Sequence, residues 1–187
     1  MLALQSLEFS FLYFLQELRT PFLDEVVPVF TSLGDKGLIF VALGAVLFII
    51  PRTRKMGFII LLSLAAGFIL GNGIIKNLVM RDRPCWIEPG ILLLIENPHD
   101  YSFPSGHTLA AFETAVSIFL INRRWGIPAL IFAALMGLSR MYLFVHFPSD
   151  VLSGMALGIF IAWFVSRCVE KYKIYDILIL QIKKKAE

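Results

Sequence analysis

Three short polar segments separate the long apolar runs of this sequence, and they hold most of its chemically versatile side chains. A charged side chain at membrane depth costs about 2.5 kcal/mol or more, so such residues commonly mark a functional site. We expect the fold to bring the three segments together. Their candidate functional residues are Lys76, Arg83, Ser105, Gly106, His107, Ser139, Arg140, His146 and Asp150.

The cations in these segments suit a phosphate dianion. Arg83 and Arg140 each offer planar pairs of N–H donors, and Lys76 offers a compact positive charge. Pro104 fits the first turn of a helix, whose free backbone N–H groups attract anions. Gly106 would let an anion approach the backbone closely. The sequence therefore predicts an anion site made of protein groups, with no metal.

The histidines add a reaction to this site. His146 and Asp150 are four residues apart, so Asp150 can hold one ring nitrogen as N–H while the other attacks phosphorus. His107, on another helix, can protonate the departing oxygen and then activate the water that releases the phosphohistidine. These roles predict a phosphatase.

Other polar residues suit ordinary structural roles. We expect Arg81 and Asp82 to form a solvated pair, Glu113 to make an interhelical hydrogen bond, and His99 to lie at the membrane interface. Ser139 leaves two interpretations open, a contact with phosphate or a hydrogen bond to its own helix.

The composition predicts an all-α, polytopic membrane bundle. Of 187 residues, 58% are apolar and 17% charged, against about 45–50% and about 25% in soluble domains. A bilayer core of about 30 Å needs about 20 helical residues. We expect five to six transmembrane helices and no nucleic-acid partner. Nearly charge-free runs occupy residues 37–50, 57–75, 109–121, 126–145 and 151–165.

The chain divides into three regions. Residues 1–20 predict an amphipathic helix at the interface or, alternatively, a sixth span. Residues 21–170 form the membrane-embedded domain, and residues 171–187 predict a basic amphipathic tail on the cytoplasmic surface.

The distribution of basic residues predicts the topology. Residues 51–55, 122–124 and 167–185 are rich in lysine and arginine, and the expected spans place all three on one side of the membrane. The positive-inside rule assigns that side to the cytoplasm. The three polar segments then lie together on the outer face.

The three segments resemble the signatures of the type 2 phosphatidic acid phosphatase superfamily, which also includes vanadium haloperoxidases. Those signatures are a lysine, six residues and Arg-Pro; Pro-Ser-Gly-His; and Ser-Arg, five residues, His, three residues and Asp. This sequence carries all three in the same order, without departure, and the resemblance covers about residues 23–169.

That resemblance implies the superfamily's helical core, shared with haloperoxidases, and catalysis without a metal or other cofactor. It implies that His146 is the nucleophile, Asp150 its partner and His107 the general acid. The phosphate would be bound by Lys76, Arg83, Ser105, Gly106 and Arg140, with help from Ser139.

The resemblance also implies a membrane lipid phosphate as substrate. The compact chain looks most like bacterial enzymes that convert undecaprenyl diphosphate to undecaprenyl phosphate at the extracytoplasmic face of the cytoplasmic membrane. Alternatives are a phosphatidylglycerol phosphate or phosphatidate phosphatase, a lipid phosphotransferase, and a transporter or other non-catalytic phospholipid binder. The sequence leaves the oligomeric state open.

Overall fold

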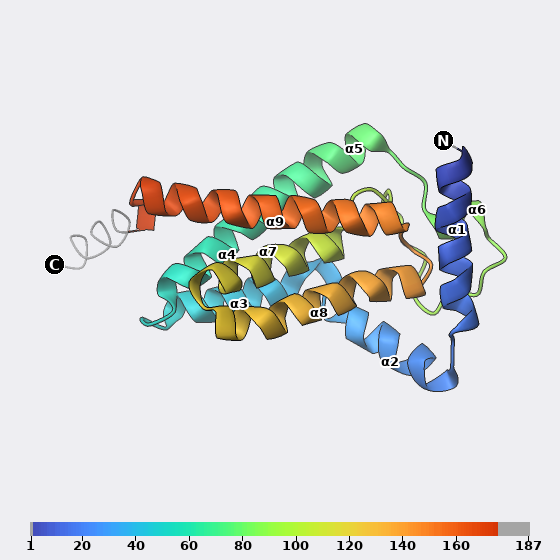
Figure 1. The fold of residues 1–187 in the computed structure, drawn as a ribbon, viewed down its shortest axis with the longest axis horizontal. Coiled ribbons are helices and arrows are strands. Elements are labelled where there is room, and N and C mark those ends of the chain that lie inside the picture. Colours follow the sequence, from blue (N-terminus) through green and yellow to red (C-terminus); the bar gives the residue numbers. More distant parts are fainter. Residues whose placement is uncertain (1, 176–187) are drawn as a thin grey trace.

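The computed structural model describes residues 2–175, and the regular elements in them are helices, with no strand. The longer helices form one elongated bundle, and most of them run along its length (Figure 1). In chain order the elements are α1 (Leu2–Glu17), α2 (Pro21–Ser32), the one-turn η1 (Asp35–Gly37), α3 (Leu38–Ile49), α4 (Arg54–Gly67), η2 (Phe68–Ile75), α5 (Lys76–Val79), α6 (Pro84–Ile87), α7 (Gly106–Ile121), α8 (Arg123–Tyr142) and α9 (Pro148–Lys171).

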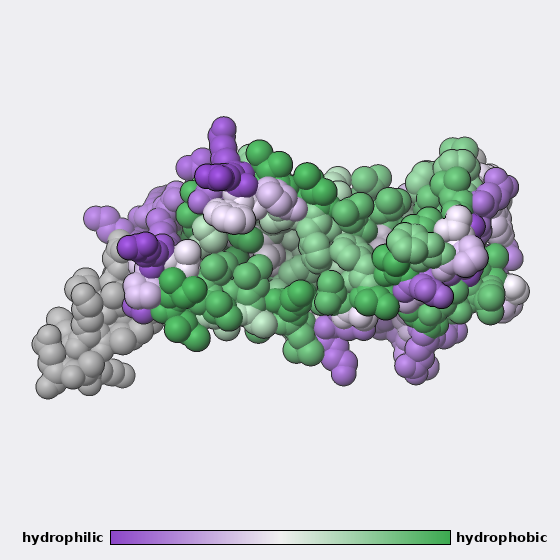
Figure 2. Space-filling view, turned by 90° about the horizontal axis from the view of Figure 1, so that it is seen from below, coloured by the Kyte–Doolittle hydropathy of each residue, from purple (hydrophilic) through white to green (hydrophobic). Residues whose placement is uncertain are grey.

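The predicted membrane bundle is confirmed. Among the described residues, four helical segments are long and apolar enough to cross a membrane, and α7 is a shorter apolar helix. Hydrophobic side chains cover the middle of the face shown in Figure 2, and hydrophilic residues gather toward its ends. The spanning candidates are Pro21–Ile49, Arg54–Ile87, Arg123–Tyr142 and Pro148–Lys171.

The first of these segments is longer than the apolar run 37–50 suggested. Thr20 caps α2 by accepting a hydrogen bond from Leu23 N at 3.3 Å, and Pro21 occupies the first helical position. The single turn η1 then connects α2 to α3, so the segment begins at Pro21 rather than at residue 37.

Helix α7 lies at the centre of the bundle, packed against α4, α8 and α9. Nearly every residue from Thr108 to Ile118 is buried. A Cβ at Gly154 of α9 would lie 2.7 Å from the carbonyl oxygen of Ser105, so glycine there lets the two backbones touch. This contact sets the second polar segment directly against the third.

The element η2 is a π-helical stretch between α4 and α5. Such stretches are wider than an α-helix and often occur at functional sites. Asn72 lies within η2 and Lys76 directly follows it, and both line the cavity described below. The π-helical turns therefore help to direct these two side chains.

Helix α1 crosses the end of the bundle at a steep angle to α8 and α9 (Figure 1). Its buried face holds Glu8, Leu12 and Leu15. The two alternatives for this helix, an interfacial position or a sixth span, both stay predictions. A separate stripe of exposed apolar side chains is formed by Leu4, Leu7, Phe11, Phe14 and Leu18. Of the predicted tail, residues 176–187 lie outside the described residues.

Candidate active site

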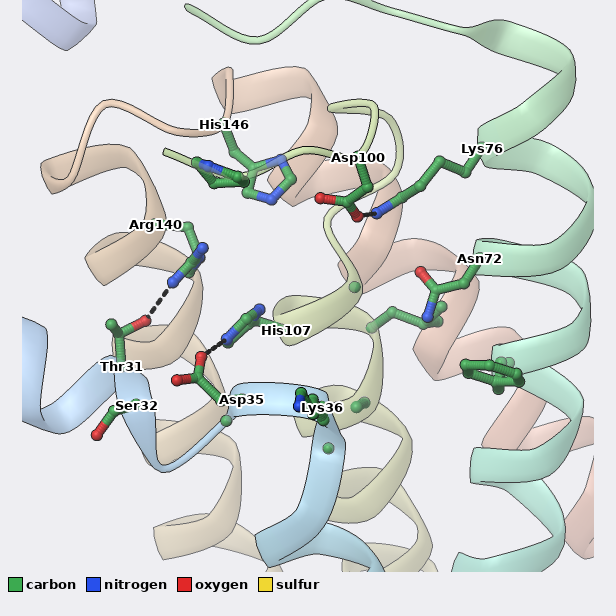
Figure 3. Close-up of a pocket in the computed structure, with 18 of the residues that line it drawn as sticks. Thr31, Ser32, Asp35, Lys36, Asn72, Lys76, Asp100, His107, Arg140 and His146 are labelled. Carbon is green, nitrogen blue, oxygen red and sulfur yellow. Dashed lines mark hydrogen bonds and ion pairs between the residues drawn. The ribbon is translucent and has the colours of Figure 1, made fainter. Parts of the chain in front are cut away.

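The three polar segments converge at the end of the bundle that α1 crosses, around a cavity of about 1070 Å³. Their side chains come from different helices and loops and point toward a shared space (Figure 3). The predicted site residues that line the cavity are Lys76, Arg83, Gly106, His107, Arg140 and His146.

Arg83 is the centre of the polar contacts. Its buried guanidinium donates to the carbonyl oxygens of Asp100 and Val145, each at 2.7 Å. Its Nη1 also lies 3.1 Å from Nε2 of His146. Arg83 therefore joins the first polar segment to the third.

This contact fixes the tautomer of His146. A guanidinium can only donate hydrogen bonds, so Nε2 of His146 is the acceptor and Nδ1 carries the proton. Nδ1 faces Oγ of Ser102 at 3.4 Å and Oδ2 of Asp150 at 3.6 Å. Burial, and then the positive charge of Arg83, hold the pKa of His146 well below its ordinary value. The imidazole is therefore neutral and unprotonated at Nε2, the nitrogen that a nucleophile would use, and the Nε2 lone pair accepts the hydrogen bond from Arg83 in this structure.

Asp150 is fully buried at the start of α9. Its Oδ2 accepts hydrogen bonds from Phe147 N at 2.8 Å and from the hydroxyl of Ser102. The predicted pairing with His146 is present, although 3.6 Å exceeds a direct hydrogen bond and Ser102 bonds to both residues.

The prediction that Arg81 forms a solvated pair with Asp82 is wrong. Instead its Nη1 lies 2.7 Å from Oδ1 of Asp150, and its Nη2 lies 2.6 Å from Oε2 of Glu8. No signal in the sequence connects position 8 with position 81.

His107 lies in the first turn of α7 and faces the cavity from the side opposite His146 (Figure 3). Its Nε2 lies 3.0 Å from Oδ1 of Asp35, which belongs to η1. Asp35 was not among the predicted site residues, since only the fold brings η1 beside α7. A carboxylate at this distance orients the ring.

Arg140 is buried against Thr31 of α2, with its Nη1 2.7 Å from the Thr31 hydroxyl. Its Nε is also buried and has no hydrogen-bond partner among the described residues. A buried donor without a partner costs about 1–3 kcal/mol. An anion bound beside Arg140 would supply an acceptor.

Two of the predicted phosphate-binding cations hold a carboxylate in this structure. Lys76 Nζ lies 2.5 Å from Oδ2 of Asp100, and Arg83 Nη2 lies 2.7 Å from Oδ1. Partial burial would raise the pKa of Asp100, but Lys76 and Arg83 outweigh it and hold that pKa well below its usual range. Asp100 was not among the predicted site residues, since it lies 24 residues from Lys76 in the sequence.

Two predicted residues lie behind the cavity wall. The Ser105 hydroxyl accepts a hydrogen bond from Thr108 at 2.9 Å, and its backbone N–H donates to Asp150 O at 3.1 Å. The Ser139 hydroxyl donates to Met136 O at 2.7 Å, as its second interpretation expected. Their roles in binding phosphate stay predictions, as does that of Gly106 at the cavity wall.

Comparison with known proteins gives the family. The model of the PAP2 superfamily matches residues 54–174. An undecaprenyl-diphosphatase of Sulfolobus acidocaldarius is 35% identical over 136 residues, which are 72% of this chain and 66% of that protein. Phosphatidylglycerophosphatase B of Bacillus subtilis is 31% identical over 170 residues, 83% of this chain and 80% of that protein.

A solved structure is similar as well. The crystal structure of a transmembrane PAP2 type phosphatidylglycerolphosphate phosphatase from Bacillus subtilis aligns with a TM-score of 0.74 and 30% identity. The alignment covers 90% of this chain and 87% of that one. The chain therefore belongs to the PAP2 superfamily, as a multi-pass membrane member.

Proposed function

We propose that the chain, a membrane lipid phosphatase of the PAP2 superfamily, removes phosphate from its substrate through a phosphohistidine at His146. The observation that carries this proposal is the position of His146 Nε2, 3.1 Å from Arg83 at the wall of a cavity whose lining also includes Lys76 and Arg140. A neutral imidazole beside such cations can attack a bound phosphate.

The reaction has two steps. Lys76, Arg83 and Arg140 hold the phosphate oxygens while Nε2 of His146 attacks phosphorus, forming a P–N bond and breaking the bond to the leaving oxygen. His107 donates a proton to that oxygen. His107 then removes a proton from a water molecule, which attacks the phosphohistidine and frees inorganic phosphate and the His146 ring.

Our preferred substrate is undecaprenyl diphosphate, which would lose its terminal phosphate to give undecaprenyl phosphate. The similarity to an undecaprenyl-diphosphatase supports this choice. The cavity also has an apolar part, lined by Val41, Leu61 and Phe68, which suits a lipid chain. The second candidate substrate is phosphatidylglycerol phosphate. It is supported by the similarity to phosphatidylglycerophosphatase B of Bacillus subtilis, which covers 80% of that protein.

We place the active site on the outer face of a bacterial cytoplasmic membrane, with the C-terminus in the cytoplasm. The basic loop after α3 and the end of α9 lie at the end of the bundle away from the cavity (Figure 1). Lys55 and Glu170 form an ion pair of 3.8 Å there. The positive-inside rule supports a cytoplasmic location for this end.

The test is phosphate release by the purified protein in detergent, with and without EDTA. Undecaprenyl diphosphate, phosphatidylglycerol phosphate and phosphatidate are assayed in parallel, each beside a His146→Ala variant. We expect release that survives EDTA, is lost in the variant and is fastest with undecaprenyl diphosphate.

Three outcomes would contradict parts of the proposal. Release that EDTA abolishes would contradict metal-independent catalysis, and full release by the variant would contradict the nucleophile. Appearance of the phosphoryl group on an added acceptor lipid, rather than as inorganic phosphate, would identify a phosphotransferase.

A further inference from the structure

Helix α1 is joined to the catalytic centre by a chain of charged hydrogen bonds. Glu8 of α1 contacts Arg81 at 2.6 Å, and Arg81 contacts Asp150 at 2.7 Å. The Arg81 guanidinium thus bridges two carboxylates through separate nitrogens. Neither Glu8 nor Arg81 lines the cavity, so both contact the site from behind.

The same chain of hydrogen bonds anchors the first turn of α9. Oε1 of Glu8 accepts hydrogen bonds from Ser149 N at 3.1 Å and from the Ser149 hydroxyl at 2.5 Å. Arg81 Nη1 also donates to that hydroxyl at 2.7 Å, and its Cζ lies 4.0 Å from the centre of the Phe147 ring. Glu8 and Arg81 therefore contact residues on both sides of Pro148, where α9 begins.

Because these groups are buried, this chain of hydrogen bonds determines how the Asp150 carboxylate is oriented. Asp150 is fully buried and Glu8 is 5% exposed. A buried carboxylate that loses its cation is left with an uncompensated charge, which is far more costly than losing a surface pair. Arg81 supplies a cation to both carboxylates, and it holds Oδ1 of Asp150 while Oδ2 faces Ser102 and His146.

We propose that Glu8 and Arg81 are positioning residues, which fix the Asp150 carboxylate and through it the ring of His146. Helix α1 is then part of the support of the active site. This inference rests on the proposed function of His146 as nucleophile. It assigns to α1 a role outside the three signature segments.

The kinetic test compares Glu8→Gln with Glu17→Gln, a matched change at an exposed position of the same helix. Glu8→Gln should lower kcat by about tenfold, the size of one hydrogen bond between charged groups, with KM unchanged. Arg81→Lys keeps the charge but cannot bridge both carboxylates, and should show the same pattern. Glu17→Gln should behave as the wild-type protein. A rise in KM alone would overturn the proposal.

A double-variant measurement separates positioning from general loss of structure. If Glu8 acts through Asp150, Glu8→Gln should cause little further loss of kcat in an Asp150→Asn background. Independent losses that multiply would contradict the proposal. Thermal unfolding in detergent accompanies each variant, and a kcat loss matched by loss of folded protein would also contradict it.

A spectroscopic test does not depend on activity. Histidine-selective ¹⁵N labelling reports the tautomer of His146, whose signals are identified with His146→Ala. Wild-type protein should show Nδ1 protonated, and Glu8→Gln and Arg81→Lys should shift these signals while Glu17→Gln does not. Unchanged signals would overturn the positioning role. A wild-type protein without phosphatase activity would instead contradict the proposed function, and the labelling result would still test the positioning role.

Discussion

Asp100 and Lys76 form an ion pair of 2.5 Å at the cavity, where the proposed function places a substrate phosphate. The other oxygen of the same carboxylate contacts Arg83. Asp100 is 57% exposed and comes from the loop between α6 and α7, so it can move aside without disturbing a helix. A bound phosphate and the Asp100 carboxylate would compete for the same two cations.

This competition gives the first prediction. Asp100→Asn removes the competing charge and should lower both KM and the inhibition constant of inorganic phosphate by about tenfold, the size of one charge-assisted contact. Inhibition by phosphate in the steady-state assay measures it. Asp82→Asn, the same change at an exposed position that does not line the cavity, is the control. Weaker phosphate binding in Asp100→Asn would show that Asp100 organises the cations instead of competing for them.

The buried His146 predicts a dependence of stability on pH. Its folded pKa is held below the ordinary 6.5, so below about pH 6.5 the unfolded chain binds a proton that the folded chain does not. The free energy of unfolding must therefore decrease as the pH is lowered through that range. Asp100 does not contribute to this window, because a carboxylate with a lowered pKa loses its stabilising effect only below its ordinary value of 3.8.

The measurement is Tm in detergent at about pH 7 and about pH 5, for the wild-type protein and His146→Gln. We expect a larger decrease on acidification for the wild-type protein, since glutamine takes up no proton. Equal decreases in the two proteins would mean that His146 is protonated in the folded state.

The contact between His107 and Asp35 predicts a large loss of kcat when His107 is replaced and a smaller loss when Asp35 is replaced. His107→Asn should lower kcat for a lipid substrate by about 10²–10⁴-fold, the usual contribution of general acid–base catalysis. Asp35→Asn should cause a smaller loss, because Asp35 orients the ring without transferring the proton. The loss in His107→Asn should shrink with an aryl phosphate whose leaving group needs no protonation. An equal loss with both substrates would argue against the role of His107 as acid.

The residues at the cavity were largely predictable because their chemistry is compressed into three short segments. Lysine, arginine and histidine between apolar runs indicate a site whatever the details of packing. Lys76, Arg83, His107, Arg140 and His146 all line the cavity as expected.

The supporting residues were not predictable, because their partners are far away in the sequence. Glu8 and Arg81 are 73 residues apart, and Asp35 and His107 are 72 apart. An isolated carboxylate in an amphipathic helix or a loop looks like an ordinary solvated group. Ser102 was missed for the same reason, since only its contacts with His146 and Asp150 distinguish it from any other loop serine.

The apolar runs predicted the helices of the fold, but not all the contacts that orient them. Helix α2 ends at Ser32 and α3 begins at Leu38, with Lys36 and Gly37 between them in the left-handed backbone region, and the two helices together form one candidate membrane segment. The direction of α1 across the bundle depends on the contacts of Glu8 and of the buried Leu12. The helical periodicity of the sequence alone does not reveal these contacts.

The central claim is that a phosphoryl group passes through His146, and trapping that intermediate tests it most directly. The purified protein is mixed with undecaprenyl diphosphate carrying ³²P in its terminal phosphate, quenched in alkali within one turnover, and examined for label on the protein. The wild-type protein should carry label that survives alkali and is lost in acid, as expected of phosphohistidine, and His146→Ala should carry none. Label on another residue, or phosphate release by His146→Ala at the wild-type rate, would contradict the account.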